Sequence, residues 1–163
     1  EAAGRIPGAA RQALSGIDPQ TLHAQPAGRG NSIAWLVWHA ARQLDAQLAA
    51  LSGEQQLWSR DDWGSRLGID RGADEIGFGD SLADVAALQV SDPALLAAYL
   101  DAAVAELVAY LATTPELDDV VDTRWDPPVT RGVRLVSIID DAVAHLGQAA
   151  YVRGVVSEWS IGY

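Results

Sequence analysis

The stretch Ser137-Ile-Ile-Asp-Asp-Ala-Val-Ala-His-Leu-Gly-Gln-Ala-Ala-Tyr-Val-Arg153 carries polar side chains inside a run of apolar residues. Its apolar residues recur every three or four positions, which predicts a helix. Asp141 and His145 are four residues apart and Gln148 follows three later, so one helical face presents all three side chains. A carboxylate and an imidazole one turn apart are ligands that a divalent metal can take from a single helix. A third ligand must come from elsewhere, and His39 is the clear candidate.

His39 lies in the middle of a second predicted helix. Asn31 or Ser32 is placed to cap its start. Residues 33–51 contain neither glycine nor proline, and Gly53 follows where a C-terminal cap belongs. Taken alone, an inward-facing histidine is also consistent with a core side chain that one hydrogen bond satisfies. The carboxylate and imidazole on the later helix favour a metal ligand instead.

Two further helices complete the expected fold. Residues 1–16 have apolar side chains spaced for one helical face, and residues 91–113 repeat the apolar spacing of a bundle helix. The last helix is expected to follow Gly132 and to end at Gly154, because glycine interrupts helices. Four long helices in one domain, residues 1–163, predict an all-α four-helix bundle.

A long loop insertion separates the second and third predicted helices. Residues 54–90 are irregular, aromatic and charged, with Trp58 and Trp63 near their start. Long connections without secondary structure are uncommon in compact domains and often line a site. We therefore expect the two tryptophans either to line a pocket or to close one end of the bundle.

Composition excludes several classes of protein. The chain has 163 residues, of which 49% are hydrophobic, so it is long and apolar enough to form a core. A net charge of −11 and the absence of lysine argue against nucleic acid and anionic membranes as partners. No uninterrupted apolar run approaches the ~18 residues of a membrane span and no signal peptide is visible, so a cytoplasmic location is expected. Without cysteine, any metal site must use nitrogen and oxygen ligands.

Two segments resemble the DinB-like (YfiT-type) helical bundle proteins. Asn31-Ser-Ile-Ala-Trp-Leu-Val-Trp-His-Ala-Ala-Arg42, followed by Asp45, is similar to the second helix of that family, in which the mid-helix histidine binds metal. His145-Leu-Gly-Gln-Ala-Ala-Tyr-Val-Arg153 resembles the closing motif, His-x-x-x-His-x-Gly-Gln followed by an aromatic residue and arginine. The order and separation of the segments also agree. The resemblance spans most of the chain and implies a metal-binding four-helix bundle.

One position departs from the family pattern. Where the family usually has the first histidine of the closing motif, this chain has Asp141, and a relative, the mycothiol-dependent maleylpyruvate isomerase, has a carboxylate there. The resemblance thus implies His39, Asp141 and His145 as the metal ligands. Because aspartate is short, it can bind the metal directly or hold a water on it. The site can also be a degenerate one that no longer binds metal.

The ligand set and the resemblance together suggest a chemistry. Two imidazoles and one carboxylate suit zinc or nickel, also match the facial triad of non-haem iron, and leave a position for water or substrate. Relatives include thiol-dependent transferases and isomerases, in which a low-molecular-weight thiol is thought to bind the open position. Since this chain has no cysteine, any thiolate must come from a cosubstrate.

Arg42 and Gln148 are candidates for supporting roles. Arg42 lies about one helical turn after His39, on the same face, and can pair with a cosubstrate carboxylate. Alternatively, it forms an ion pair with Asp45 or Asp140. Gln148 can orient His145 or a water on the metal, or it can tie down a helix.

Two functions from different classes remain. The first is a divalent-metal-dependent transferase or isomerase that acts with a thiol on a small molecule. The second is a non-catalytic bundle with a degenerate metal site, acting as a structural or interaction protein, in which Asp141 pairs with His39, His145 or Arg42. Trp159 in the C-terminal tail is also consistent with a homodimer.

Overall fold

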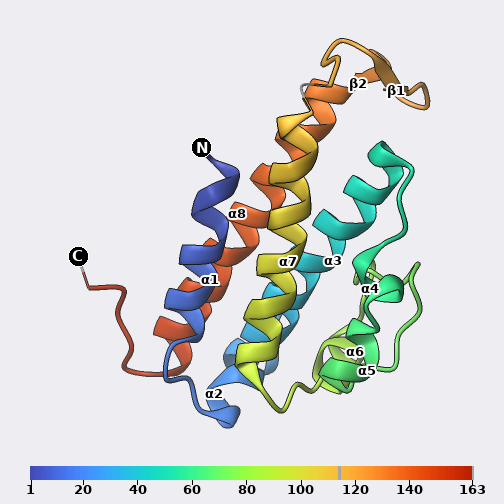
Figure 1. Ribbon diagram of the computed structural model, residues 1–163. Coiled ribbons are helices and arrows are strands. Elements are labelled where there is room, and N and C mark those ends of the chain that lie inside the picture. The colour runs from blue at the N-terminus through green and yellow to red at the C-terminus, as the bar shows by residue number, and fades with distance from the viewer. Residues whose placement is uncertain (114, 163) are drawn as a thin grey trace.

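The bundle is built from four helices, which lie side by side in Figure 1. The computed structural model describes residues 1–113 and 115–162 of the chain. Numbered in chain order, the first bundle helix contacts the third and the fourth. The second bundle helix also contacts the third and the fourth. The predicted all-α bundle is therefore confirmed. Its members are α1 (Ile6–Leu14), α3 (Ile33–Ser52), α7 (Pro93–Ala112) and α8 (Arg131–Val156).

The central helix is α3. Residues 32–45, which run from its N-cap to its middle, are all buried. The Ser32 hydroxyl accepts a hydrogen bond from the Trp35 N–H at 3.2 Å, and Gly53 ends the helix with φ +78. These are the predicted caps. Because α7 and α8 cover only part of α3, the rest of its surface must be covered by another part of the chain.

That cover is residues 54–90, which are not the irregular loop expected from the sequence. They contain α4 (Leu57–Arg60), α5 (Trp63–Leu67) and α6 (Leu82–Ala87), which lie beside the bundle in Figure 1. The rings of Trp58 and Trp63 are buried, with centroids 5.6 and 5.2 Å from that of Tyr99 on α7. Burial of these large aromatic side chains attaches the segment to the bundle.

The last helix, α8, is longer than predicted at both ends. Thr130 caps it by accepting a hydrogen bond from the Val133 N–H, so Gly132 lies within its first turn. At the other end the helix passes through Gly154 and reaches Val156. A glycine inside a helix costs only about 1 kcal/mol, and the contacts of the neighbouring Arg153 offset this cost. Its guanidinium donates to the Ala13 and Ser15 carbonyls at 2.8 Å each and so caps the end of α1.

Shorter elements fill the connections. The first helix begins at Ile6, later than predicted, after a 3-10 turn. A two-stranded antiparallel hairpin joins α7 to α8 at one end of the bundle, with Val120 opposite Thr130 (Figure 1). The short elements are η1 (Ala3–Arg5), α2 (Pro19–His23), η2 (Pro26–Gly28), β1 (Val120–Asp122) and β2 (Val129–Thr130).

Among the residues that the structure describes, one helix, α7, is long and apolar enough to cross a membrane by length and composition, with a mean hydropathy of 1.7 over an 18-residue window. Its apolar sequence is interrupted by Asp101 and Glu106. Asp101 forms an ion pair with Arg11, and Glu106 forms one with Arg60, both outside the core. Its opposite side supplies residues such as Leu100 to the bundle interior. Inside the structure, 33% of this apolar window is buried.

Candidate metal centre

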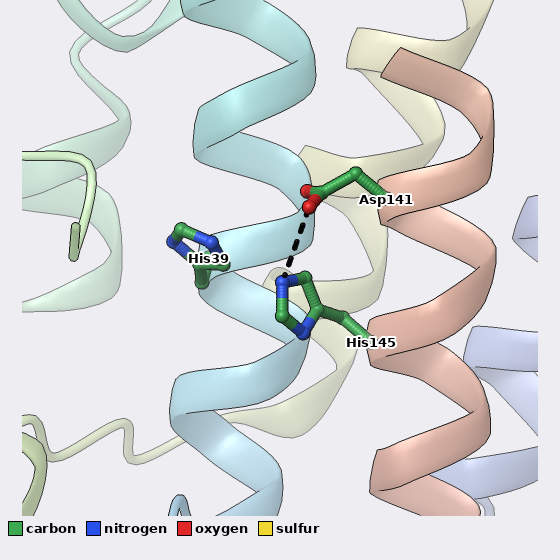
Figure 2. Close-up of side chains that lie close together, drawn as sticks. All are labelled: His39, Asp141 and His145. Carbon is green, nitrogen blue, oxygen red and sulfur yellow. Dashed lines mark ion pairs between the residues drawn. The ribbon is translucent and has the colours of Figure 1, made fainter. Parts of the chain in front are cut away.

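The middle of α3 and the middle of α8 bring three predicted ligands together. Asp141 and His145 extend from α8 toward His39 on α3 (Figure 2). One ligand atom from each residue can be chosen so that all three lie within 4.8 Å of one another. The predicted convergence of two distant segments is therefore what the structure shows, and the third histidine, His23, lies outside the group.

His39 is held in an orientation suited to metal binding. Its Nδ1 contacts the Ile76 carbonyl oxygen, which can only accept, so Nδ1 carries the proton and Nε2 keeps its lone pair. The ring also stacks on Trp35, with centroids 4.6 Å apart and planes 12° apart. Burial lowers the pKa of His39, which keeps the imidazole neutral as a metal ligand requires.

His145 is oriented from its own helix. Its Nδ1 donates to Gln148 Oε1 at 3.1 Å, and its Nε2 lies 3.5 Å from Asp141 Oδ1. The predicted contact between Gln148 and His145 is therefore present. The neighbouring Asp141 carboxylate raises the pKa of His145. In this pair, a proton or a metal cation can be shared by the imidazole nitrogen and the carboxylate.

Asp141 carries the observation that best fits a cation. Its Oδ2 is buried and has no hydrogen-bond partner among the residues that the structure describes. A buried carboxylate oxygen without a partner is unfavourable, and a cation would satisfy it. The contact between Asp141 and His145 is also what a purely structural pair would show, and the Asp141 side chain as a whole is 41% exposed, so metal content is the measurement that separates the two interpretations.

The separations are compatible with one coordination sphere. With bonds of about 2.1 Å, two ligands of a tetrahedral zinc ion lie about 3.4 Å apart. The 3.5 Å between His145 Nε2 and Asp141 Oδ1 is close to this value. The remaining separations need only small side-chain rotations, because all three atoms already lie within 4.8 Å of one another. His39, Asp141 and His145 can thus hold a divalent cation, and Asp141 reaches the site despite its short side chain.

The model of one protein family, described as the DinB superfamily, matches residues 4–149. The chain belongs to the DinB superfamily. A crystal structure of a conserved protein from Enterococcus faecalis has the same fold as this DinB protein, with a TM-score of 0.88. The two chains share 38% sequence identity, and the alignment covers 95% of this chain and 92% of the other. No curated protein matches the chain.

The outer wall of the site in this DinB protein comes from residues 54–90, the connection that the sequence suggested could line a site, but it is formed by residues 76–77, which the sequence did not single out. Gly77 has φ +94, and an added Cβ would lie 2.9 Å from the rings of His39, Trp35 and Trp38. The backbone of residues 76–77 therefore lies directly on the histidine and its aromatic neighbours. The sequence signal was the pair of glycines flanking Phe78, since close approach of backbone to a side chain favours glycine.

Polar contacts attach this wall to the DinB bundle. Asp80 accepts hydrogen bonds from Trp35 Nε1 and from Arg71, at 2.7 Å each. The Arg71 guanidinium also lies over the Trp38 ring, 4.7 Å from its centroid. The segment that holds His39 Nδ1 is thus fixed from several directions.

Arg42 does not serve as a cosubstrate contact. Its side chain is 0% exposed, and it pairs with Asp45 at 3.3 Å, which is the ion-pair alternative. It also donates to Tyr99 Oη at 3.1 Å and to the Ala73 carbonyl at 2.6 Å. The other predicted partner, Asp140, is exposed on α8. In the DinB fold of this chain, Arg42 positions the covering segment through its Nη1 and Nη2 donors, while its buried Nε has no hydrogen-bond partner among the described residues.

Proposed function

We propose that this protein binds one divalent cation, zinc or nickel, through His39, Asp141 and His145, and uses it in a thiol-dependent transfer or isomerisation of a small molecule. The observation that carries the proposal is the convergence of two oriented imidazoles on a carboxylate with a partnerless buried oxygen. Three protein ligands leave room for an exogenous ligand, as catalytic sites require.

The side chains have different roles in such a site. His39 and His145 present Nε2 because carbonyl and amide oxygens hold their Nδ1 atoms, and Asp141 supplies the compensating negative charge. Trp35 and the backbone at Gly77 cover one side of His39 and exclude water from it. A bound divalent cation supplies positive charge that favours the deprotonated, nucleophilic form of a thiol. Because the chain has no cysteine, the thiol is a cosubstrate, for which we propose a mycothiol-type molecule in the cytoplasm.

Metal content tests the first half of the proposal. We expect protein prepared without an affinity tag to contain about one divalent ion per chain, and His39→Ala to contain almost none, since two ligands rarely retain a metal at low concentration. The measurement is elemental analysis by inductively coupled plasma mass spectrometry after dialysis. His23→Ala is the matched control, because its ring contacts Pro19 and Val90 rather than the site.

The same samples separate the two function classes. Metal removal should lower the melting temperature of the wild type and leave that of His39→Ala unchanged, since a ligand bound only to the folded state stabilises it. Wild-type protein with no more metal than His39→Ala would contradict the proposal and support the non-catalytic bundle.

Cobalt substitution tests the role of the thiol. Adding mycothiol to the cobalt(II)-loaded protein is expected to produce a sulfur-to-metal charge-transfer band in the near-ultraviolet, because a coordinated thiol is deprotonated. The S-methylated thiol is the control, since it has no proton to lose. A spectrum that responds equally to both compounds, or to neither, would leave a metal-binding protein without thiol chemistry and so reject this half of the proposal.

A further inference from the structure

A pocket of about 520 Å³ lies where the end of α3 meets the hairpin and the start of α8. Its volume is within the range of small-molecule sites. One wall of the pocket is apolar and is formed by residues of α3 and by Val121. The other wall carries charged and amide groups. The residues that line it are Ala46, Gln47, Ala50, Leu51, Val121, Asp122, Arg124, Arg131 and Arg134.

The charge of this pocket is opposite to that of the molecule as a whole. Three of the 11 basic residues line it, although the chain has a net charge of −11. Among the lining residues, only Asp122 is acidic. Asp119 lies nearby and pairs with Arg131 at 3.1 Å, so the three guanidinium groups face two carboxylates and keep a positive excess.

The three arginines are not equivalent. Arg131 donates to the Glu116 and Leu51 carbonyls as well as to Tyr110 Oη, so its guanidinium holds the hairpin and the helix ends together. Arg134 and Arg124 both contact Asp122, at 3.0 and 2.8 Å.

Arg124 and Arg134 both line the pocket and retain unpaired N–H donors. Within residues 1–113 and 115–162, neither Arg124 Nη1 nor Arg134 Nε has a hydrogen-bond partner. The Arg134 side chain is 26% exposed and is held against Gln47 Oε1 at 3.1 Å. The Arg124 side chain is 83% exposed and can adjust to a ligand.

We propose that this pocket binds the oxyanion group of a small molecule, a carboxylate or a phosphate, between Arg124 and Arg134. Planar guanidinium groups with free N–H donors match the paired oxygens of both anions. The alanines of α3 and Leu51 then contact the apolar part of the ligand next to the anionic group. Asp122 positions the two arginines, because its carboxylate forms an ion pair with each of them while each keeps an unpaired N–H donor.

The pocket lies on the same pair of helices as the candidate metal centre. Arg134 precedes Asp141 by seven residues, or roughly 10 Å along α8 at 1.5 Å per residue. A chain of hydrogen bonds runs along the seam, from Arg134 to Gln47, from Gln47 to Gln43, and from Gln43 to the Ile138 carbonyl. The pocket and the candidate metal centre share no residue, so anion binding at the pocket can be measured with the metal removed.

Titration of the chelator-treated, ¹⁵N-labelled chain with sodium butyrate and with inorganic phosphate, at matched ionic strength, tests this site. The arginine Nε–H resonances of Arg124 and Arg134 should shift and saturate with at least one anion. Tighter binding of butyrate assigns the site to carboxylates with an apolar body, and tighter binding of phosphate assigns it to phosphates. Shifts that stay linear with both anions would overturn the proposal.

Variants localise the effect. We expect Arg134→Gln and Arg124→Gln each to weaken binding about tenfold or more, as loss of a charged hydrogen bond does. Arg124→Gln remains decisive if Arg134→Gln unfolds, because the Arg124 side chain is mostly in solvent. The matched control is Arg29→Gln, which makes the same charge change at an exposed position before the other end of α3. Equal weakening by Arg29→Gln and Arg124→Gln would overturn the proposal.

Discussion

Asp45→Ala is expected to lower the free energy of unfolding by about 3–5 kcal/mol, since it removes one partner of a buried ion pair. The Asp45 carboxylate accepts from the Leu57 and Trp58 N–H groups at 2.8 and 2.9 Å. It also accepts from the Tyr99 hydroxyl at 2.8 Å and pairs with Arg42. Without it, the Arg42 charge is left buried and the start of α4 loses its acceptors.

Urea denaturation of Asp45→Ala, followed by far-ultraviolet circular dichroism, measures this change. Asp101→Ala is the control, because Asp101 also pairs with an arginine, Arg11, at 2.7 Å but at the surface. Surface pairs contribute only about 0–1 kcal/mol. If the two variants lost similar stability, the buried network would not be holding residues 54–90 on the bundle.

Gly77→Ala is expected to displace the wall of the metal centre and to weaken metal binding. The new Cβ would lie 2.9 Å from three rings, and φ +94 is itself strained for alanine. Relief of the clash moves the backbone away from His39, so the Ile76 carbonyl no longer holds Nδ1. Loss of such an orienting partner typically reduces metal affinity about 10–100-fold. Competition with a chromophoric chelator measures the affinity.

Gly79→Ala separates the clash from the strain. Gly79 belongs to the same segment and has φ +84, but nothing lies within 4 Å of an added Cβ. We therefore expect a modest loss of stability, about 1–2 kcal/mol from the left-handed backbone, with metal affinity preserved. If Gly79→Ala weakened metal binding as much as Gly77→Ala, contact with the His39 ring would not be the cause.

The helices and their caps were largely predictable because the interactions that set them are local. Ser32 and Gly53 cap α3 as the sequence indicated, and Asp92 caps α7. The shared face of Asp141 and His145 follows from helical periodicity alone. Gly154 misled the prediction for α8, since the favourable contacts of its neighbour Arg153 lie on α1 and have no local signature.

Arg42 shows most clearly what the sequence left open. Its position one turn after His39 was equally consistent with a cosubstrate contact and with an ion pair. The choice depends on Tyr99, from another helix, and on the Ala73 carbonyl, from the covering segment. Neither contact follows from helical spacing, because both partners are distant in the chain.

By itself, the sequence determined the bundle class, the helical face that carries Asp141 and His145, and the candidacy of His39. Hydrophobic periodicity and capping act within a few residues, so they can be recognised without knowledge of packing. Only the tertiary structure decided that His39 meets the other two side chains and that residues 76–77 cover it. It also decided that arginines gather beside the hairpin. These features depend on how segments far apart in the chain pack against α3, which no local interaction specifies.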